Sequence, residues 1–201
     1  MEQAPAHAQP SFPDTTTGIH NNKVGVWLFI ASEVMFFSSL IVAMMLIRAS
    51  AGKPSELFVS SLVLVSVNTF ILVTSSLFMA LSLAFVRRGR RRAYLPTLLI
   101  TALLGTIFVG IQFLVEYPRL MGEGLTFDGV PYIFGSIFYL LTGFHGLHVL
   151  VGVLWIGVML IRGLLGHLGP GNSIGVESAG LYWHFVDAVW IVLFTIIYLI
   201  P

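Results

Sequence analysis

The chain has 201 residues, of which 57% are hydrophobic and only 9% are charged. A water-soluble domain carries about 25% charged residues, so a chain this poor in charge cannot cover itself with a polar surface and must have lipid as its solvent. The net charge of +1 indicates no polyanionic partner such as nucleic acid, and the absence of cysteine excludes disulfides, thiolate metal sites and cysteine nucleophiles.

The first 22 residues are rich in Ala, Pro, Gln and Thr. They have neither a basic stretch nor an apolar core, so we expect no cleavable signal peptide there. Residues 1–22 are predicted to form a flexible cytoplasmic tail, and residues 23–201 a single transmembrane domain.

Five apolar segments follow in chain order. About 20 apolar residues cross the hydrocarbon core as a helix, and the segments that meet this length are residues 24–47, 57–86, 94–115, 132–161 and 181–200. Helices are expected because lipid offers no water to satisfy open backbone groups. No internal repeat is visible, which disfavours an inverted-repeat transporter. The predicted fold class is all-α, a polytopic bundle of five transmembrane helices.

The basic residues predict the orientation of the bundle, because Lys and Arg are enriched in cytoplasmic loops. Five arginines lie within Arg87–Arg92, between the second and third spans. With that loop inside, the amino terminus and Arg162 are also cytoplasmic. The loop carrying Glu123 and Asp128 and the carboxyl terminus are then periplasmic. The arginine cluster itself is interpreted as a topology anchor beside anionic lipid.

Ionisable side chains inside the predicted spans are the candidate functional residues. They are Glu33, His145, His148, His184 and Asp187. A charged group at mid-membrane costs about 2.5–3.5 kcal/mol, so such residues usually face protein or a polar cavity. His145 and His148 are three positions apart, as are His184 and Asp187, so each pair shares one helix face. The helical rise puts Glu33, His148 and Asp187 in the cytoplasmic half, where they can meet.

Three interpretations of these residues compete. Three histidines and two carboxylates are adequate metal ligands, but di-metal sites in helix bundles draw on four Glu and two paired His, which this chain lacks. His148 and His184 could be axial ligands of a haem. The third interpretation, which we favour, is a buried polar network that fixes helix packing. Glu33 would be neutral there because burial disfavours the charged carboxylate, although such a carboxyl can also move protons. No catalytic residue and no metal site are predicted.

Other residues predict tight helix packing. Small residues let neighbouring backbones approach, and the fourth span carries Gly143, Gly146, Gly152 and Gly157. Polar residues of the second span can hydrogen-bond between helices, among them Asn68, Thr69 and Ser75. Trp183 and Trp190 are seven positions apart and share a face, which favours packing or interface anchoring over a cofactor cage.

Particular strings in these spans resemble a known family. Trp27–Phe37 reads W-L-F-I-A-S-E-V-M-F-F, Gly143–Val149 reads G-F-H-G-L-H-V, and Tyr182–Trp190 reads Y-W-H-F-V-D-A-V-W. Asn68-Thr69 and Glu116-Tyr117 fall between them in order. Together these strings resemble cytochrome c oxidase subunit III, from about residue 20 to the end. The chain has five spans rather than seven and is similar to the short bacterial form.

The resemblance implies a subunit without redox centres, because haem and copper belong to subunits I and II. It implies packing against subunit I, contact with subunit II and other oxidase subunits, and bound phospholipid in a cleft between helices. The subunit would support proton uptake and the stability of a proton-pumping complex fed by cytochrome c.

The resemblance also carries over to single residues. Glu33 matches a buried carboxyl beside the lipid cleft, while Arg162 and His167 match a basic pair that contacts lipid phosphate. A guanidinium at headgroup depth can bind a phosphate bidentately. The alternative for Arg162 is an ordinary side chain that snorkels to the membrane surface.

Other functions remain as alternatives. Subunit III of a quinol oxidase or a nitric-oxide-reductase-associated homologue would share this layout, although Glu33 followed by Phe36-Phe37 favours the cytochrome c type. From other classes, the chain could be a stand-alone proton-coupled transporter with Glu33 and the histidines as a relay, or a free-standing haem or metal protein. The expected location is the bacterial inner membrane.

Overall fold

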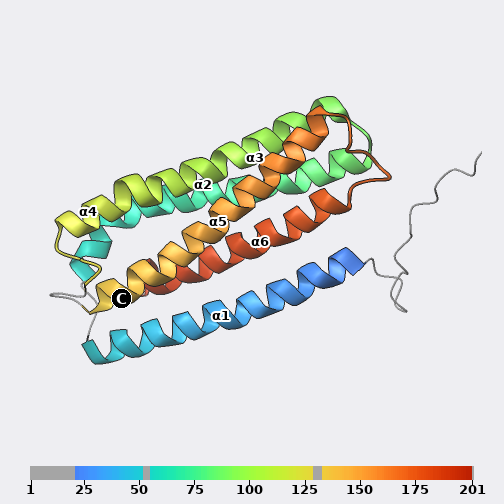
Figure 1. The fold of residues 1–201 in the computed structure, drawn as a ribbon. Helices are drawn as coiled ribbons and strands as arrows, with labels where there is room; N and C mark the ends of the chain where they lie inside the picture. Colours follow the sequence, from blue (N-terminus) through green and yellow to red (C-terminus); the bar gives the residue numbers. More distant parts are fainter. Residues whose placement is uncertain (1–20, 52–54, 129–132, 201) are drawn as a thin grey trace, which may run out of the picture.

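The computed structural model describes residues 21–51, 55–128 and 133–200, and its regular structure over these residues is all helical (Figure 1). The long helices are α1 (Asn21–Ala51), α2 (Ser55–Arg87), α3 (Arg91–Ile111), α5 (Phe134–Leu164) and α6 (Ile174–Phe194). Shorter elements extend two of them: the π-helix η1 (Gln112–Glu116) and α4 (Tyr117–Gly122) follow α3, and the π-helix η2 (Thr195–Leu199) follows α6.

Within the described residues, five helical stretches are long and apolar enough to cross a membrane. They are Lys23–Ser50, Glu56–Arg87, Arg91–Gly122, Phe134–Leu164 and Ile174–Leu199. The predicted all-α fold and its five spans of membrane-crossing length are therefore confirmed. Most of the predicted tail, residues 1–20, lies outside the described residues, and helix α1 already includes Asn21.

Two helices extend beyond the apolar segments identified in the sequence. The last helix begins at Ile174 rather than at Leu181, because Glu177, which interrupts the apolar run, finds basic partners on other helices. The third span does not end at Val115 but continues through η1 and α4 to Gly122.

Two helices end at glycines with left-handed backbone. Gly89 has φ 65° and Gly166 has φ 80°, conformations that cost glycine least. Beyond Gly89, the Arg90 N–H donates to the Phe85 carbonyl at 3.0 Å, which caps α2. The arginine cluster thus forms the tight turn between α2 and α3. We call this end of the bundle the arginine end, and the other, where η2 finishes, the carboxyl end.

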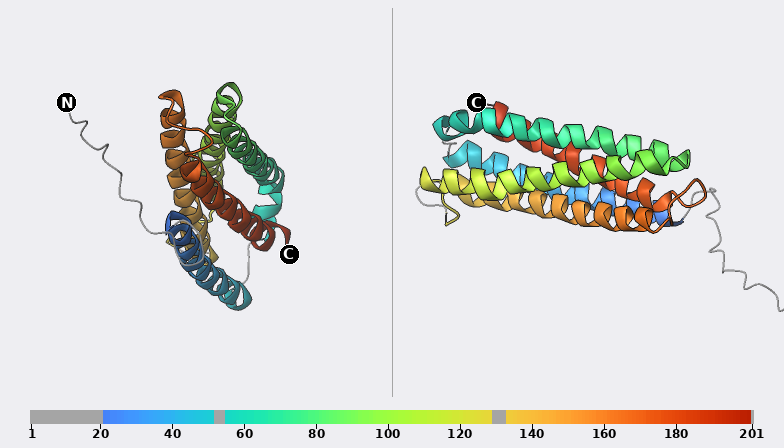
Figure 2. Two further views of the ribbon diagram at one scale, coloured as in Figure 1. Left: turned by 90° about the vertical axis from the view of Figure 1, so that its right-hand side faces the viewer. Right: turned by 90° about the horizontal axis from the view of Figure 1, so that it is seen from above.

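Helices α2, α3, α5 and α6 form a four-helix core, and α1 packs beside it against α5 and α6 (Figures 1 and 2). The largest buried side chains in this core are aromatic. Trp183 donates from Nε1 to Ser75 Oγ and Trp190 donates from Nε1 to Thr69 Oγ1, both at 2.9 Å. These contacts confirm the tryptophans as packing residues that tie α6 to α2.

Three glycines of the core pack against aromatic rings rather than against neighbouring backbones, which corrects the predicted packing mode for Gly146 and Gly152. A Cβ on Gly152 would lie 2.8 Å from the Trp183 ring, and one on Gly146 would lie 2.5 Å from Phe113. On α3, Gly105 faces Trp183 in the same way. A Cβ on Gly157 would meet nothing within 4 Å, so this glycine makes no such contact.

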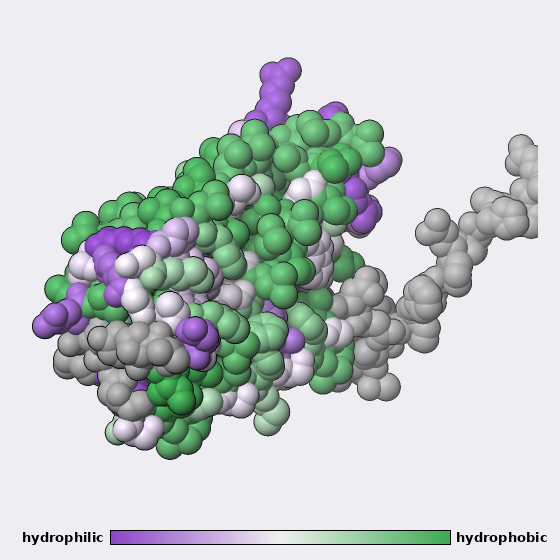
Figure 3. Space-filling model, turned by 60° about the vertical axis from the view of Figure 1, so that its left-hand side comes forward, coloured by the Kyte–Doolittle hydropathy of each residue, from purple (hydrophilic) through white to green (hydrophobic). Residues whose placement is uncertain are grey.

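The flanks of the bundle present apolar side chains. Figure 3 shows one face on which hydrophobic residues dominate, while hydrophilic ones gather toward the ends. Met35, Val63 and Leu114 are 77%, 75% and 77% exposed. A surface of this kind is stable in lipid and not in water.

Candidate functional site

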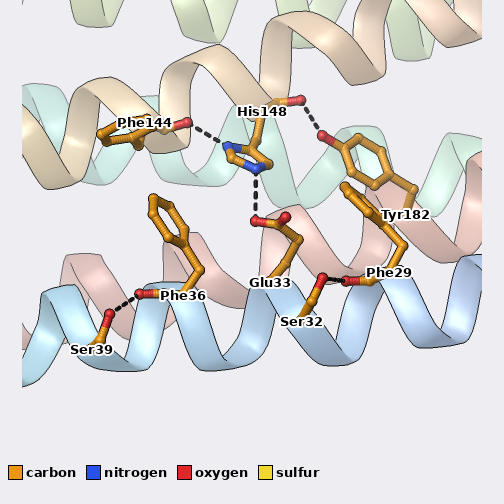
Figure 4. A network of polar contacts seen from close by, with 8 residues as sticks. All are labelled: Phe29, Ser32, Glu33, Phe36, Ser39, Phe144, His148 and Tyr182. Atoms are coloured by element: carbon orange, nitrogen blue, oxygen red, sulfur yellow. Dashed lines mark hydrogen bonds and ion pairs between the residues drawn. The ribbon is translucent and has the colours of Figure 1, made fainter.

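Glu33 on α1 and His148 on α5 form a pair between two helices (Figure 4). The His148 Nε2 atom lies 3.0 Å from Glu33 Oε2, and the two side chains are only 16% and 17% exposed. On the other side of the ring, His148 Nδ1–H donates to the Phe144 carbonyl at 2.7 Å. Both imidazole nitrogens of His148 therefore make hydrogen bonds.

The geometry of this pair requires one proton between its two partners. A carbonyl only accepts, so the bond to Phe144 fixes a proton on Nδ1. The contact between Nε2 and Oε2 then needs a single further proton, either on a neutral Glu33 or on a charged His148. The pair can hold a proton in either form without rearranging its heavy atoms.

Aromatic groups surround the pair. The Phe37 ring contacts the imidazole edge-on with centroids 5.1 Å apart, and the Phe36 ring lies 6.4 Å from it. The Tyr182 hydroxyl of α6 donates to the His148 carbonyl at 2.9 Å, so three helices meet here. Figure 4 shows Phe36, His148 and Tyr182 where α1, α5 and α6 meet.

The other predicted site residues do not join this pair. His145 is buried against the Trp190 ring, with centroids 4.8 Å apart, and its Nε2 bonds the Val186 carbonyl at 3.2 Å. Asp187 is buried and faces Ser76 of α2. His184 is exposed on the surface of the described chain. The single predicted network of five residues is therefore divided into separate contacts.

The contacts of His148 and the exposure of His184 bear on the alternative haem and metal sites. His148 would have to release Glu33 to bind a haem iron, and His184 faces outward. Within residues 21–51, 55–128 and 133–200, no three His, Cys, Asp or Glu side chains are grouped so that they could hold a metal ion.

A cleft of about 890 Å³ opens at the arginine end, between α1 and the α5–α6 hairpin. Arg162, at the end of α5, is exposed and lines it together with Asn172. The Phe29 and Tyr182 rings, 6.1 Å apart, line it as well. Glu33 lies one helical turn beyond Phe29, so the proton-holding pair sits just below the cleft. His167 is exposed and is not among the lining residues.

The ionic contacts of Glu177 were not predicted from the sequence. Its carboxylate accepts from Lys23 Nζ at 2.7 Å and from Arg87 at 3.0 Å, which joins α1, α2 and α6 at the arginine end. At the carboxyl end, Arg48 donates to the carbonyls of Ile196 and Ile200, each at 2.9 Å. The available signal was the acidic Glu177 itself, which precedes the predicted last span of residues 181–200 and lies in the first turn of α6.

Comparison with known proteins gives a consistent result. A family model described as cytochrome c oxidase subunit III matches residues 13–200. The cytochrome c oxidase subunit 3 of a Synechocystis species is 39% identical over 198 residues, covering 97% of this chain and 80% of that protein. The protein of the same name from Bacillus subtilis is 34% identical over 206 residues, covering 99% and 96%.

A protein with a different electron donor in its name is similar to the same degree. The probable quinol oxidase subunit 3 of Staphylococcus saprophyticus is 35% identical over 183 residues, covering 89% of each chain. The helical architecture, the residue strings and these matches agree, and this chain belongs to the cytochrome c oxidase subunit III family, the third subunits of haem–copper oxidases.

Proposed function

We propose that the chain is the non-catalytic subunit III of an aerobic cytochrome c oxidase in a bacterial inner membrane, where it packs on subunit I and holds structural phospholipid. Haem and copper would reside in subunits I and II, and oxygen reduction and proton pumping in the complex as a whole. The observation that carries the lipid-holding role is the cleft between α1, α5 and α6 with Arg162 at its edge.

The cleft has the chemistry of a phospholipid site. Its walls carry Val26, Phe29, Val151 and Trp155, which suit acyl chains. Arg162 lies in the last turn of α5, close to the arginine turn, where a headgroup phosphate would sit. A guanidinium binds phosphate through two parallel hydrogen bonds. His167 would contribute only from outside the cleft.

The distribution of charge supports a cytoplasmic amino terminus. The Arg87–Arg92 turn, Lys23 and Arg162 all belong to the arginine end. Arg48 and Arg119 belong to the carboxyl end. Because basic residues are retained on the cytoplasmic side, the arginine end would face the cytoplasm and the carboxyl terminus the periplasm.

The second candidate is subunit III of a quinol oxidase, favoured by the relative of that name. Glu33 followed by Phe36 and Phe37 favours the cytochrome c type. Purification of the tagged chain with its co-eluting subunits separates the two. We expect a copper-containing subunit II and oxidation of reduced cytochrome c. A complex that oxidises only quinol would establish the alternative.

The lipid site is tested by Arg162→Ala, with Arg88→Ala as the matched control at the same end of the bundle. Arg88 is exposed and is not among the residues that line the cleft. We expect Arg162→Ala to reduce the phospholipid retained per haem in the purified oxidase, as measured by mass spectrometry, with little change in expression. Equal lipid content in the two variants would mean that Arg162 merely snorkels.

A stand-alone transporter makes the opposite prediction. The isolated chain would then move protons across proteoliposomes, and deleting it would leave oxidase activity unchanged. We expect no transport by the chain alone and a faster loss of oxidase activity during turnover when the chain is deleted.

A further inference from the structure

Another buried carboxyl group, that of Glu116, lies in the core of the bundle near the end where η2 finishes. Glu116 is 1% exposed, and the Tyr198 hydroxyl donates to its Oε1 atom at 3.2 Å. Its other oxygen, Oε2, has no hydrogen-bond partner. Ser61 of α2 faces the same carboxyl without a hydrogen bond of normal geometry. None of these residues belongs to α1 or to the Glu33–His148 pair.

Gln112 lies one helical turn before Glu116 in η1, and its side chain also lacks hydrogen-bond partners. It is 1% exposed, and within the described part of the chain neither its Nε2 nor its Oε1 atom makes a hydrogen bond of normal geometry, although the Tyr117 side chain faces it. Next to Glu116, the Tyr117 hydroxyl bonds Thr142 Oγ1 at 2.8 Å. Buried polar atoms normally have a protein or water partner, so four unpartnered atoms on three adjoining side chains require an explanation.

Two π-helical segments build this place. Gln112 and Glu116 are the first and last residues of η1, and Tyr198 lies in η2. The Tyr117 N–H donates to the Gln112 carbonyl, and the Ile200 N–H donates to the Thr195 carbonyl, each across five residues. Such segments insert an extra residue into a helix and occur often at functional sites. The segment η1 supplies Gln112 and Glu116, and η2 supplies Tyr198, whose hydroxyl donates to the Glu116 carboxyl.

The polar atoms that lack hydrogen-bond partners indicate which kind of ligand would fit between them. A bound cation could contact the oxygens of Glu116, Gln112 and Ser61, but it could not accept from the Gln112 Nε2 donor, which makes no hydrogen bond of normal geometry with the neighbouring Tyr117. Water both donates and accepts, and a buried water typically makes about three hydrogen bonds to such groups. We propose that Gln112, Glu116, Ser61 and Tyr198 form a closed binding site for internal water, which makes Glu116 a hydrated carboxyl centre separate from the Glu33–His148 pair.

X-ray hydroxyl-radical footprinting in ¹⁸O water tests this site in the purified oxidase complex. Internal water is activated where it lies, so neighbouring side chains are labelled although bulk solvent does not reach them. Tyr198 is 6% exposed and adjoins the site. Tyr94 is 1% exposed, lies near the arginine end and is the matched control. We expect labelling of Tyr198 and background labelling of Tyr94. Background labelling of both would overturn the proposal.

Gln112→Met adds a stability readout. If water bridges Gln112 to Glu116, the variant loses that water and leaves the Glu116 carboxyl without a hydrogen-bond partner at Oε2. We then expect a lower melting temperature and severalfold weaker Tyr198 labelling. If the amide is merely unpaired, its removal raises the melting temperature, which would contradict the proposal. Ser61→Ala, a smaller change, should also weaken the Tyr198 labelling, and it serves as the test if Gln112→Met does not assemble.

A melting temperature that rises with NaCl but not with choline chloride would instead indicate a cation and refute the water site. All these readouts are independent of oxidase activity and of the lipid cleft.

Discussion

Helix α1 and the four-helix core are held together in different ways. The apolar stretch of α1 has 17% of its residues buried, whereas that of α6 has 44%. Helix α1 is attached by polar contacts at three depths: Lys23 with Glu177, Glu33 with His148, and Arg48 with the carbonyls that end η2. The core is held by tryptophan and phenylalanine rings seated on glycines.

The difference follows from the solvent. Lipid tails are as apolar as leucine, so helices in a membrane gain little from burying apolar surface against each other. Close packing holds the core because rings fill the space that glycine leaves. Helix α1 buries a smaller share of its residues, and hydrogen bonds supplement its aromatic contacts with α5 and α6. The cleft lies beside it, at the arginine end.

The largest expected effect is on the core. In Gly105→Ala the new Cβ would lie 2.4 Å from Trp183 Cη2 and 2.8 Å from Val153 Cγ2. The buried ring cannot move away, so we expect a loss of about 1–3 kcal/mol or more in the free energy of unfolding. Gly157→Ala is the control, because its Cβ meets nothing. It should be neutral or more stable by up to about 1 kcal/mol. Thermal unfolding of the complex in nanodiscs measures both, and equal stabilities would refute the ring-on-glycine packing.

An intermediate effect is expected at the polar contact of α1. Glu33→Leu leaves the His148 Nε2 atom unsatisfied, which should cost about 1–3 kcal/mol. Glu33→Gln can still donate to Nε2 and should cost less than about 1 kcal/mol, with assembly largely intact. Co-purification of the other oxidase subunits and thermal unfolding report the two outcomes. If Glu33→Gln fails to assemble, the pair does not contain a neutral carboxyl.

The smallest effect is expected at the ionic contact. Lys23→Met removes the bond to Glu177 but leaves the one from Arg87, and both groups are partly exposed. We expect a loss of about 0–1 kcal/mol. Because salt screens such pairs, the difference from wild type should shrink in high salt. A larger loss that does not respond to salt would show that Lys23 holds α1 by packing of its stem.

Much of the fold was predictable because composition constrains it directly. Five apolar runs predicted five helices, and the strings around Glu33, His148 and Trp183 indicated the family. The limits of the last helix were not predictable, since Glu177 and Ser178 look like loop residues until their partners are known. The same is true of the site: His148 and His184 are equivalent by spacing, yet one is paired and the other is exposed.

The sequence by itself determined that the chain lies in lipid as a helical bundle, because backbone groups in hydrocarbon must bond within their own segment. Only the tertiary structure decided which polar groups meet. Partners such as Glu33 and His148 are 115 residues apart, and their contact depends on how α1 and α5 are rotated about their axes. The packing contacts between helices, such as the Trp183 ring on Gly105 and Gly152, also join residues far apart in the chain, so no local pattern encodes them. Only the tertiary structure likewise shows that buried polar atoms of Gln112 and Glu116 lack hydrogen-bond partners within the described residues.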